Sequence, residues 1–338
     1  MKRKCFVLVL LGLIAGISMI CGLSTVFAQS QGGMKKIVII RYKLPPDDFQ
    51  DTVKNFKIEM TNNGFIEGKN VQYVDLLTST GDQSSTPEVE AWVDQHKDSA
   101  DAFVTCGWVG MVVRNKIKGS RIPQVCTFVF QPVAVKLMGG PLDKPSGSNV
   151  TTIYLTYPPD KILQLLKAAK PSATKYGVVW HSKVPADQFF KKWYEELAPD
   201  QRQGVEFVYF DLAEGLQKVQ AEIKSAGLDA FGGGLGIRRP EFAPLLKMGI
   251  PVIGPKIDYL NIDTVRATDE LMGYYNPFNM CGIQAATILT DVLHGKNIGE
   301  IAPQGVEKQV VYVNLNAAKR FGITVPLKLL EGGTIIIN

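Results

Sequence analysis

The sequence predicts two similar doubly wound α/β lobes, and two observations lead to this fold class. First, short runs of apolar, β-branched residues alternate with longer segments of helical periodicity. Strands that are apolar on both faces indicate a parallel sheet covered by helices on both sides. Second, the second half of the chain repeats the order of motifs found in the first half. A chain of 338 residues is long enough for two domains with separate cores.

The elements of the first half follow from their periodicity. KIVIIRY at 36–42 is a continuous apolar run and predicts a strand. Segment 47–64 has apolar residues at helical spacing and ends on Gly64, as many helices do. Further strands are predicted at 71–77, 102–108 and 124–130, and further helices at 88–96 and 109–117. We expect right-handed crossovers between these parallel strands.

The repeat in the second half supports two copies of one unit. The matching pairs are KIVIIRY 36–42 with YGVVWHS 176–182, YVDL 73–76 with YFDL 209–212, DAF 101–103 with DAF 229–231, and IPQV 122–125 with IPVI 250–253. One match of three or four residues is weak, but four matches in the same order indicate a real repeat. Its period is far too long for a solenoid and predicts two lobes.

The N-terminus has the features of an export signal. A basic MKRK segment precedes an uncharged apolar run at 5–27, and Val26-Phe27-Ala28 has the small-residue spacing of a cleavage site. We therefore expect a signal peptide at 1–28 and a location in the periplasm or at the extracytoplasmic face. A retained membrane anchor is the alternative, because a run of this length could span a bilayer. A lipid anchor on Cys21 is less favoured, because Ile20 is large for a lipidation motif.

Charge and motifs argue against nucleic-acid, nucleotide and metal binding. The formal charge is +5, but basic residues are scattered and no run of five or more like charges occurs. The glycines at 232–236 do not continue into a dinucleotide fingerprint, and GFIEGKN at 64–70 lacks the spacing and the Ser or Thr of a phosphate loop. No zinc-type spacing is present. We expect neither a cofactor nor a metal.

The cysteines and histidines do not indicate an enzyme. Cys106, Cys126 and Cys281 remain after the leader, and three buried thiols are a better interpretation than a disulfide, although export permits one. Cys106 could pair with His181 as nucleophile and base. No third orienting group is evident, so we expect the protein not to be an enzyme.

From Met34 to its end the chain resembles the substrate-binding proteins of ABC transporters in the tryptophan/tyrosine-type family. The motifs that carry this resemblance are GFIEGKNV 64–71, IPQVCTFVFQPVAVKLM 122–138, SGSNVT 146–151, ILQLLKAAKPSATKYGVVWHS 162–182 and VNLNAAKRFGITVPLKLL 313–330. The resemblance implies the type I periplasmic-binding-protein fold, in which two lobes joined by a hinge trap a small ligand. It also implies a monomer that delivers its ligand to an ABC permease and its ATPase. Lobe one would comprise 34–153 plus 276–305, and lobe two 154–275 plus 306–338.

Departures from the family pattern affect the expected ligand. Family members commonly have Thr-Asp-Pro, Ser-Asp-Thr-Asp and Phe-Asp-Tyr-Tyr where this chain has Phe130-Gln131-Pro132, 255–258 (PKID) and 276–279 (NPFN). Several acidic positions that could meet an amino group are therefore missing. Basic residues end or follow nearby strands, namely Arg41, His181, Arg238, Arg239 and Lys256. One of the two adjacent arginines should face the cleft, but the sequence leaves open which one.

These features predict a small organic anion, a carboxylate with an apolar or aromatic body, bound where the strands end. The predicted ligand-binding residues are Arg41, Tyr42, Cys106, Gly107, Trp108, Gln131, Tyr154, His181, Gly234, Leu235, Arg238, Lys256, Asp258 and Phe278. Two alternatives stay open at this point. The chain could be a ligand-sensing receptor that partners a signalling protein, or, less favoured, a secreted enzyme.

Overall fold

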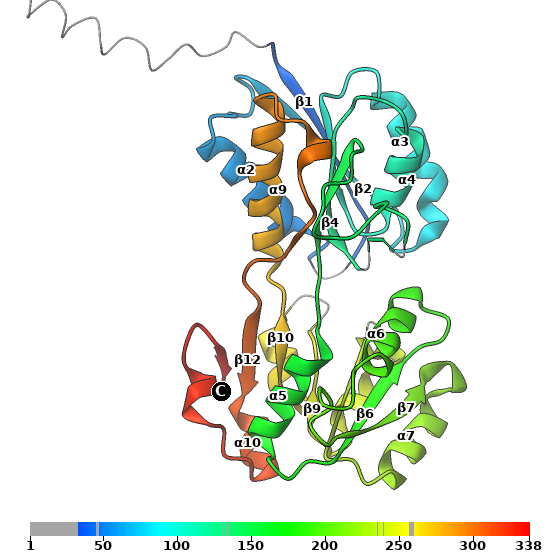
Figure 1. Ribbon diagram of the computed structural model, residues 1–338, viewed down its shortest axis with the longest axis vertical. Helices are drawn as coiled ribbons and strands as arrows, with labels where there is room; N and C mark the ends of the chain where they lie inside the picture. Colours follow the sequence, from blue (N-terminus) through cyan, green and yellow to red (C-terminus); the bar gives the residue numbers. More distant parts are fainter. Residues whose placement is uncertain are drawn as a thin grey trace, which may run out of the picture.

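The computed structural model describes residues 33–44, 47–130, 132–133, 135–234, 236–238, 240–256 and 260–338. The predicted signal peptide at 1–28 lies outside the described residues. Figure 1 shows two lobes, one above the other, joined by extended segments. Within the described residues, none of the helices is both long and apolar enough to cross a bilayer. No group of three or more His, Cys, Asp or Glu side chains there could hold a metal ion.

Lobe one is built on a sheet in which every strand pairing is parallel. In spatial order its strands are β11 (Gln304–Gly305), β5 (Val150–Tyr154), β4 (Gln124–Val129), β3 (Ala102–Cys106), β1 (Lys35–Arg41) and β2 (Val71–Leu77). Its helices are α2 (Gln50–Asn62), α3 (Thr86–His96), α4 (Val109–Lys116) and α9 (Phe278–Leu293). Short 3₁₀ segments, η2 (Gln83–Ser85) and η6 (Ile298–Glu300), complete the lobe.

The alternation of side chains along β1 explains the two helix layers of lobe one. Ile37 and Ile39 pack in the cluster that contains α2 and α9, whereas Val38 and Ile40 pack with α3 and α4. Successive side chains of a strand point to opposite faces, so a fully apolar strand needs helices on both sides. The predicted doubly wound arrangement is therefore confirmed for this lobe (Figure 1).

Lobe two repeats this arrangement and adds two strands at one edge. Its strands are, in spatial order, β13 (Ile335–Ile337), β12 (Val310–Asn314), β10 (Glu270–Tyr275), β9 (Val252–Ile253), β8 (Ala230–Gly233), β6 (Lys175–Trp180) and β7 (Glu206–Asp211). Only β10 and β12 pair antiparallel within this sheet as described. Its helices are α5 (Pro159–Ala169), α6 (Pro185–Glu195), α7 (Leu216–Ser225), α8 (Ile262–Arg266) and α10 (Leu315–Phe321), with 3₁₀ segments η3 (Leu212–Glu214), η4 (Gly236–Arg238), η5 (Pro240–Lys247) and η7 (Leu327–Leu330).

The repeat predicted from the sequence corresponds to equivalent strands. The order β5-β4-β3-β1-β2 in lobe one matches β10-β9-β8-β6-β7 in lobe two. The repeated DAF motif has one task in both lobes, because its aspartate accepts a backbone hydrogen bond from the start of the first strand. Asp101 accepts from the Lys36 amide at 2.8 Å, and Asp229 accepts from the Lys175 amide at 2.9 Å.

The strand ends of the two lobes face each other. β5 ends at Tyr154 where the chain leaves lobe one, and β10 ends at Tyr275 where the chain returns to it. Because the other strands of each lobe's repeated unit run parallel to β5 or to β10, their carboxyl ends also face the opposite lobe. In α/β sheets ligands bind at this edge.

In the part of the chain that the structure describes, three crossings connect the lobes, after β5, after β10 and after β11. One side chain links all three, since the Gln309 amide donates to the Thr156 hydroxyl at 3.0 Å and to Asn276 Oδ1 at 3.2 Å. The Asn276 amide in turn donates to the Thr156 carbonyl at 3.3 Å. These hydrogen bonds hold the three crossings next to one another, where a hinge between the lobes would lie.

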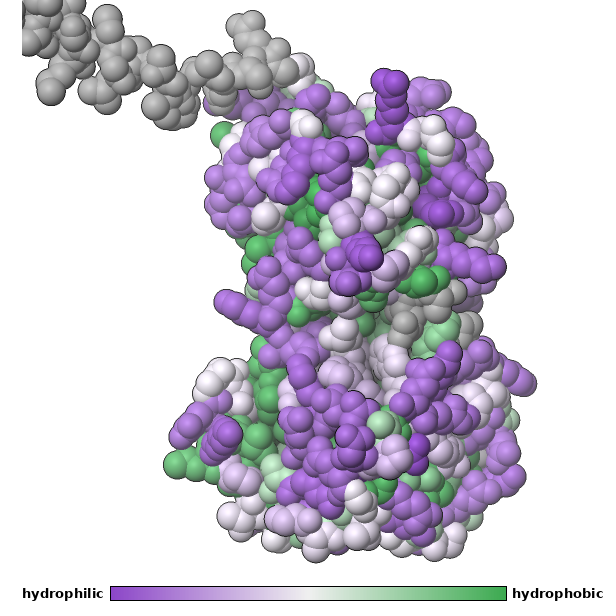
Figure 2. All heavy atoms as spheres, viewed as in Figure 1, coloured by the Kyte–Doolittle hydropathy of each residue, from purple (hydrophilic) through white to green (hydrophobic). Residues whose placement is uncertain are grey.

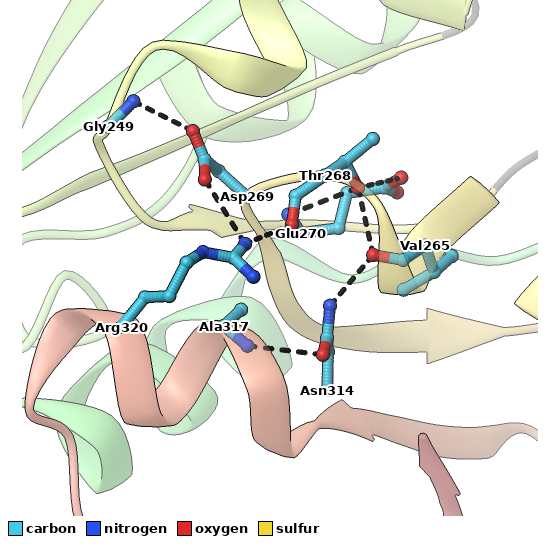
Figure 3. A network of polar contacts seen from close by, with 8 residues as sticks. All are labelled: Gly249, Val265, Thr268, Asp269, Glu270, Asn314, Ala317 and Arg320. Atoms are coloured by element: carbon cyan, nitrogen blue, oxygen red, sulfur yellow. Dashed lines mark hydrogen bonds and ion pairs between the residues drawn. The ribbon is translucent and has the colours of Figure 1, made fainter. Parts of the chain in front are cut away.

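Residues of the C-terminal motif VNLNAAKRFG (313–322) form a polar network with the segment before β10 (Figure 3). Asn314 donates to the Val265 carbonyl at 2.7 Å and accepts from the Ala317 amide, which caps α10. Arg320 pairs with Asp269 at 3.3 Å. This motif, one of those that carry the family resemblance, thus fixes the connection between β9 and β10, far from the facing strand ends.

Candidate functional site

The lobe-one part of the site is the loop after β3. Gly107 adopts a φ of +68°, and a Cβ at this position would overlap the ring of Tyr42. Only glycine meets both conditions without strain. The Tyr42 ring contacts Phe49 at a centroid distance of 4.9 Å and Trp108 at 6.1 Å. Gly107 therefore lets Tyr42 and Trp108 form an aromatic surface beside the start of α4.

The N-terminus of α4 offers hydrogen-bond donors to an acceptor group such as a carboxylate. Its N-cap residue is Trp108, which makes no side-chain capping hydrogen bond, and the first turn contains no acidic residue. The first N–H groups of a helix have no i−4 carbonyl to bind and favour negative charge. In α4 the Gly110 and Met111 amides donate to the Gly107 and Trp108 carbonyls, each at 3.1 Å, which leaves the Trp108 and Val109 amides. In addition, the Trp108 indole N–H is shielded from solvent and has no hydrogen-bond partner among the described residues. A buried indole N–H usually has a hydrogen-bond partner.

Two predicted site residues, Arg41 and Cys106, form hydrogen bonds inside lobe one. The Arg41 guanidinium binds both carboxylate oxygens of Asp75, at 2.8 and 3.3 Å, and donates to the Asp48 carbonyl. Cys106 is fully buried and accepts from the Thr127 hydroxyl at 3.3 Å. Burial raises the pKa of the Cys106 thiol to about 12, so this environment does not favour a nucleophilic thiolate.

All three described cysteines are buried and free, so the interpretation as buried thiols is confirmed. Phe278 is also in the core, with 1% of its surface exposed, and it packs on Phe128 and Phe49. In this arrangement both Cys106 and Phe278 stabilise lobe one and present no surface to the gap between the lobes.

The lobe-two loop after β8 contacts a carboxylate of the chain itself. Asp187, in the first turn of α6, is fully buried and accepts from the Gly236 amide at 2.9 Å. A Cβ on Gly234 or Gly236 would overlap the Asp187 carboxylate. Gly234 is among the predicted ligand-binding residues, and the lack of a side chain at Gly234 and Gly236 leaves room for the Asp187 carboxylate.

The two predicted basic groups of lobe two that are described are enclosed. His181 is 7% exposed; its Nδ1 accepts from the Lys183 amide, and its ring packs against Phe242. Lys256 is 2% exposed and lies 3.5 Å from Glu270, which is fully buried. Lys256 therefore has an anionic partner within lobe two.

Tyr154 lines a cavity of about 290 Å³ that both lobes and the first crossing enclose. The residues around it are Pro132 and Leu142 from lobe one, 154–159 from the crossing, and Trp193, Glu196 and Leu197 at the end of α6. Next to it, Phe130 stacks on Tyr157 at 5.4 Å and approaches Trp193 at 6.4 Å. The cavity is thus apolar on most sides and joins an aromatic cluster that spans the lobes.

Several predicted residues lie outside the described part of the chain. Gln131, Leu235 and Asp258 are among them, and the side chain of Arg238 is not described. The structure brings together Tyr42, Gly107 and Trp108. Sequence reasoning missed Asp75, Asp187, Glu270, Tyr157 and Trp193. Asp187 had a recognisable signal, an acidic residue in the first turn of a helix that begins at Pro185.

Comparisons with known proteins agree with this architecture. No family model matches the chain. A curated relative, the tyrosine-binding protein of Clostridioides difficile, is 23% identical over 280 residues, which cover 79% of this chain and 75% of the relative.

Solved structures extend the likeness to the whole two-lobed fold. An ABC domain in complex with L-Trp from Streptococcus pneumoniae has a TM-score of 0.71 at 17% identity and covers 90% of this chain and 100% of its own. A ligand-free, open substrate-binding protein with adhesive properties from Clostridium difficile has a TM-score of 0.74 at 19% identity, with 90% and 99% covered. The chain therefore has the type I periplasmic-binding-protein fold, and its predicted resemblance to the tryptophan/tyrosine-type substrate-binding proteins of ABC transporters is confirmed.

Proposed function

We propose that this protein is the extracytoplasmic substrate-binding protein of an ABC importer. It traps a small carboxylate-bearing ligand with an apolar or aromatic body between its lobes and delivers it to a permease and its ATPase. It acts as a monomer, is exported by the leader at 1–28, and has lobe boundaries at 34–153 plus 276–305 and 154–275 plus 306–338. The supporting observation is that the carboxyl ends of two repeated sheets face each other and are joined by three narrow crossings.

The proposed carboxylate site is the N-terminus of α4. The Trp108 and Val109 amides and the Trp108 indole N–H are the donors, and the rings of Tyr42 and Trp108 provide an aromatic surface beside them. Hydrogen bonds to an ionised acceptor contribute about 1.5–3 kcal/mol each. The apolar body would extend toward the aromatic cluster of Phe130, Tyr157 and Trp193.

The charges around the site support a ligand that need not be strongly anionic. Arg41 is neutralised by Asp75, and Lys256 by Glu270. A cation that already has a carboxylate partner adds little further attraction for a second one. An amino acid with an apolar side chain fits this balance, as does a simple aromatic carboxylate. The relatives named above as tyrosine-binding and L-Trp-bound agree with the first of these.

A thermal-shift panel followed by calorimetry tests the proposal. The panel contains aromatic and aliphatic amino acids, aromatic carboxylates without an amino group, dicarboxylates and neutral sugars. A true ligand at a hundredfold excess over its Kd should stabilise the protein by about 2.7 kcal/mol. Comparing each amino acid with its deaminated analogue shows whether the ligand carries an amino group. If only a neutral sugar binds, the carboxylate proposal fails.

Small-angle scattering and uptake measurements test the rest of the proposal. Closure of two lobes about a hinge should reduce the radius of gyration when the ligand saturates the protein. An unchanged radius would contradict trapping between lobes. Cells that lack this protein should lose uptake of the labelled ligand and regain it on complementation. Normal uptake with a lost transcriptional response would indicate a sensing role instead.

A further inference from the structure

A second pocket lies at the opposite end of lobe one from the facing strand ends. Its residues lie in the last turn of α4, before β4 and β5, or after α9, namely Arg114, Lys118, Gly119, Ser120, Arg121, Gly147, Ser148, Asn149, Asn297 and Ile298. Because β4 and β5 begin here and end between the lobes, the pocket occupies the outer edge of the sheet. Figure 2 shows mainly hydrophilic side chains over this end of the molecule. The pocket encloses about 560 Å³.

Among the described residues, the lining carries three positive charges and no carboxylate. Arg114, Lys118 and Arg121 have no acidic partner within salt-bridge distance among the described residues, and the polar contact of Arg114 is to the neighbouring Asn115. Other cations of the same lobe do have acidic partners, since Arg41 pairs with Asp75 and Lys116 with Asp94. Arg114 and Lys118 lie near the C-terminus of α4, where cations are favoured, but Arg121 lies beyond the influence of that helix end.

The rest of the lining holds the loops in fixed positions. The Asn149 amide donates to the Ile122 carbonyl at 2.9 Å and the Ile117 carbonyl at 3.2 Å, which joins the two loops. The Gly147 amide donates to the Gly299 carbonyl at 2.9 Å and ties in the segment after α9. The pocket is therefore a built depression with unpaired cations, and it is not a chance gap between mobile loops.

We propose that this pocket binds a phosphate-bearing anion. A phosphate group carries more charge than a single carboxylate, and the planar fork of arginine matches its oxygens in pairs. Ser120, Ser148 and Asn297 add polar groups around the same space. The volume exceeds that of one phosphate, so the group belongs to a pyrophosphate-like anion or to the headgroup of an anionic phospholipid. This site is separate from the ligand site between the lobes.

The experiment compares the wild type with K118Q/R121Q and with a control variant, K218Q/K224Q. The control removes the same number of charges from α7 of lobe two, and all four side chains are exposed. Calorimetry with phosphate and pyrophosphate tests soluble anions. Vesicles of phosphatidylcholine, with and without phosphatidylglycerol, test lipid headgroups.

We expect pyrophosphate, vesicles containing phosphatidylglycerol, or both to bind the wild type and the control. K118Q/R121Q should bind at least tenfold more weakly, because each lost cation removes a charge-assisted contact. Binding to pyrophosphate identifies a soluble ligand, and binding to the anionic vesicles alone identifies a lipid headgroup. The proposal is wrong if neither probe binds the wild type, if K118Q/R121Q binds as well as the wild type, or if the control loses as much.

Discussion

The loops after β3 and β8 occupy equivalent positions in the two lobes, yet they contact different things. In lobe one the chain passes through Gly107 and Trp108 directly into α4, and the first turn of that helix has no acidic residue. In lobe two the chain passes through Gly234 and Gly236 into 3₁₀ segments, and its backbone contacts the Asp187 carboxylate. The β3 loop has N–H donors that a ligand could use, whereas the β8 loop donates the Gly236 N–H to the Asp187 carboxylate.

This difference indicates which lobe binds first. A ligand carboxylate that approached the β8 loop would have to compete with Asp187, which is already in place and buried. At the β3 loop no such competitor exists among the described residues of the first turn of α4. We therefore expect lobe one to hold the ligand in the open state and lobe two to close over it.

The largest effect should come from Asp187→Ala. The variant removes a buried acceptor and leaves the Gly236 amide without its partner. Loss of a hydrogen bond to a charged group should lower the free energy of unfolding by about 2–3 kcal/mol. Denaturant unfolding measures this change, and Asp187→Asn, which keeps one oxygen, should lose less. A cost below about 1 kcal/mol would show that the β8 loop does not depend on Asp187.

Gly107→Ala should mainly affect binding. The added methyl group would displace the Tyr42 ring and so distort the aromatic surface beside α4. We expect an affinity loss of about tenfold, which corresponds to about 1.4 kcal/mol, measured by calorimetry with the ligand found in the panel. Gly64→Ala is the matched control, because Gly64 also has a positive φ but has no atom within 4 Å of an added Cβ. Equal affinity losses in both variants would contradict a local role for Gly107.

The sequence predicted the scaffold well because burial dictates it. Apolar runs such as 36–42 favour strands covered on both faces, and the structure has β1 at Lys35–Arg41. The repeat predicted equivalent lobes because the same aspartates, Asp101 and Asp229, hold the first strands. The boundary of the first helix was less accurate, since α2 begins at Gln50 and Phe49 adopts a left-handed conformation before it.

The charge of the site was harder to predict, because it depends on partners distant in sequence. The position of Arg41 at a strand end predicts a ligand contact, but Asp75, on the neighbouring strand, accepts from its Nε and Nη2. Lys256 similarly meets Glu270 inside lobe two. The sequence shows that a basic residue ends a strand, but only the fold shows which acidic side chain lies beside it. The aspartate of the repeated YVDL motif is Asp75, so the repeat had already singled out the residue that pairs with Arg41.

Asp229→Asn tests whether the repeated DAF aspartates have the same role in both lobes. Burial alone would raise the pKa of Asp229, but hydrogen bonds from Lys170, Thr174 and Lys175 outweigh it and hold the pKa below its usual value. The folded-state pKa thus lies below the unfolded value, so the carboxylate stabilises the protein above about pH 4 and this contribution is lost as the pH falls further.

We expect Asp229→Asn to cost about 1–2 kcal/mol at neutral pH and to reduce the acid dependence of stability. Denaturant unfolding between neutral and acidic pH measures both effects. Asp101→Asn is the matched variant in lobe one, where the aspartate accepts from Lys36 and pairs with Lys35. If only one of the two variants lowers the free energy of unfolding at pH 7, the two aspartates do not have the same role.

The smallest effect, and the most specific test of the lobe-one loop, should come from Trp108→Phe. The change keeps an aromatic ring against Tyr42 and removes the indole N–H, which has no partner among the described residues. An unsatisfied buried donor destabilises a protein, so its removal should offset the lost ring area and leave the free energy of unfolding within about 1 kcal/mol of the wild type. If the N–H donates to the ligand after closure, the affinity should fall several-fold with little change in stability. Trp92→Phe, on α3 and away from the strand ends, controls for the loss of an indole. An unchanged affinity together with higher stability would mean that the N–H is a cost of packing in lobe one, and the carboxylate would then depend on the α4 amides alone.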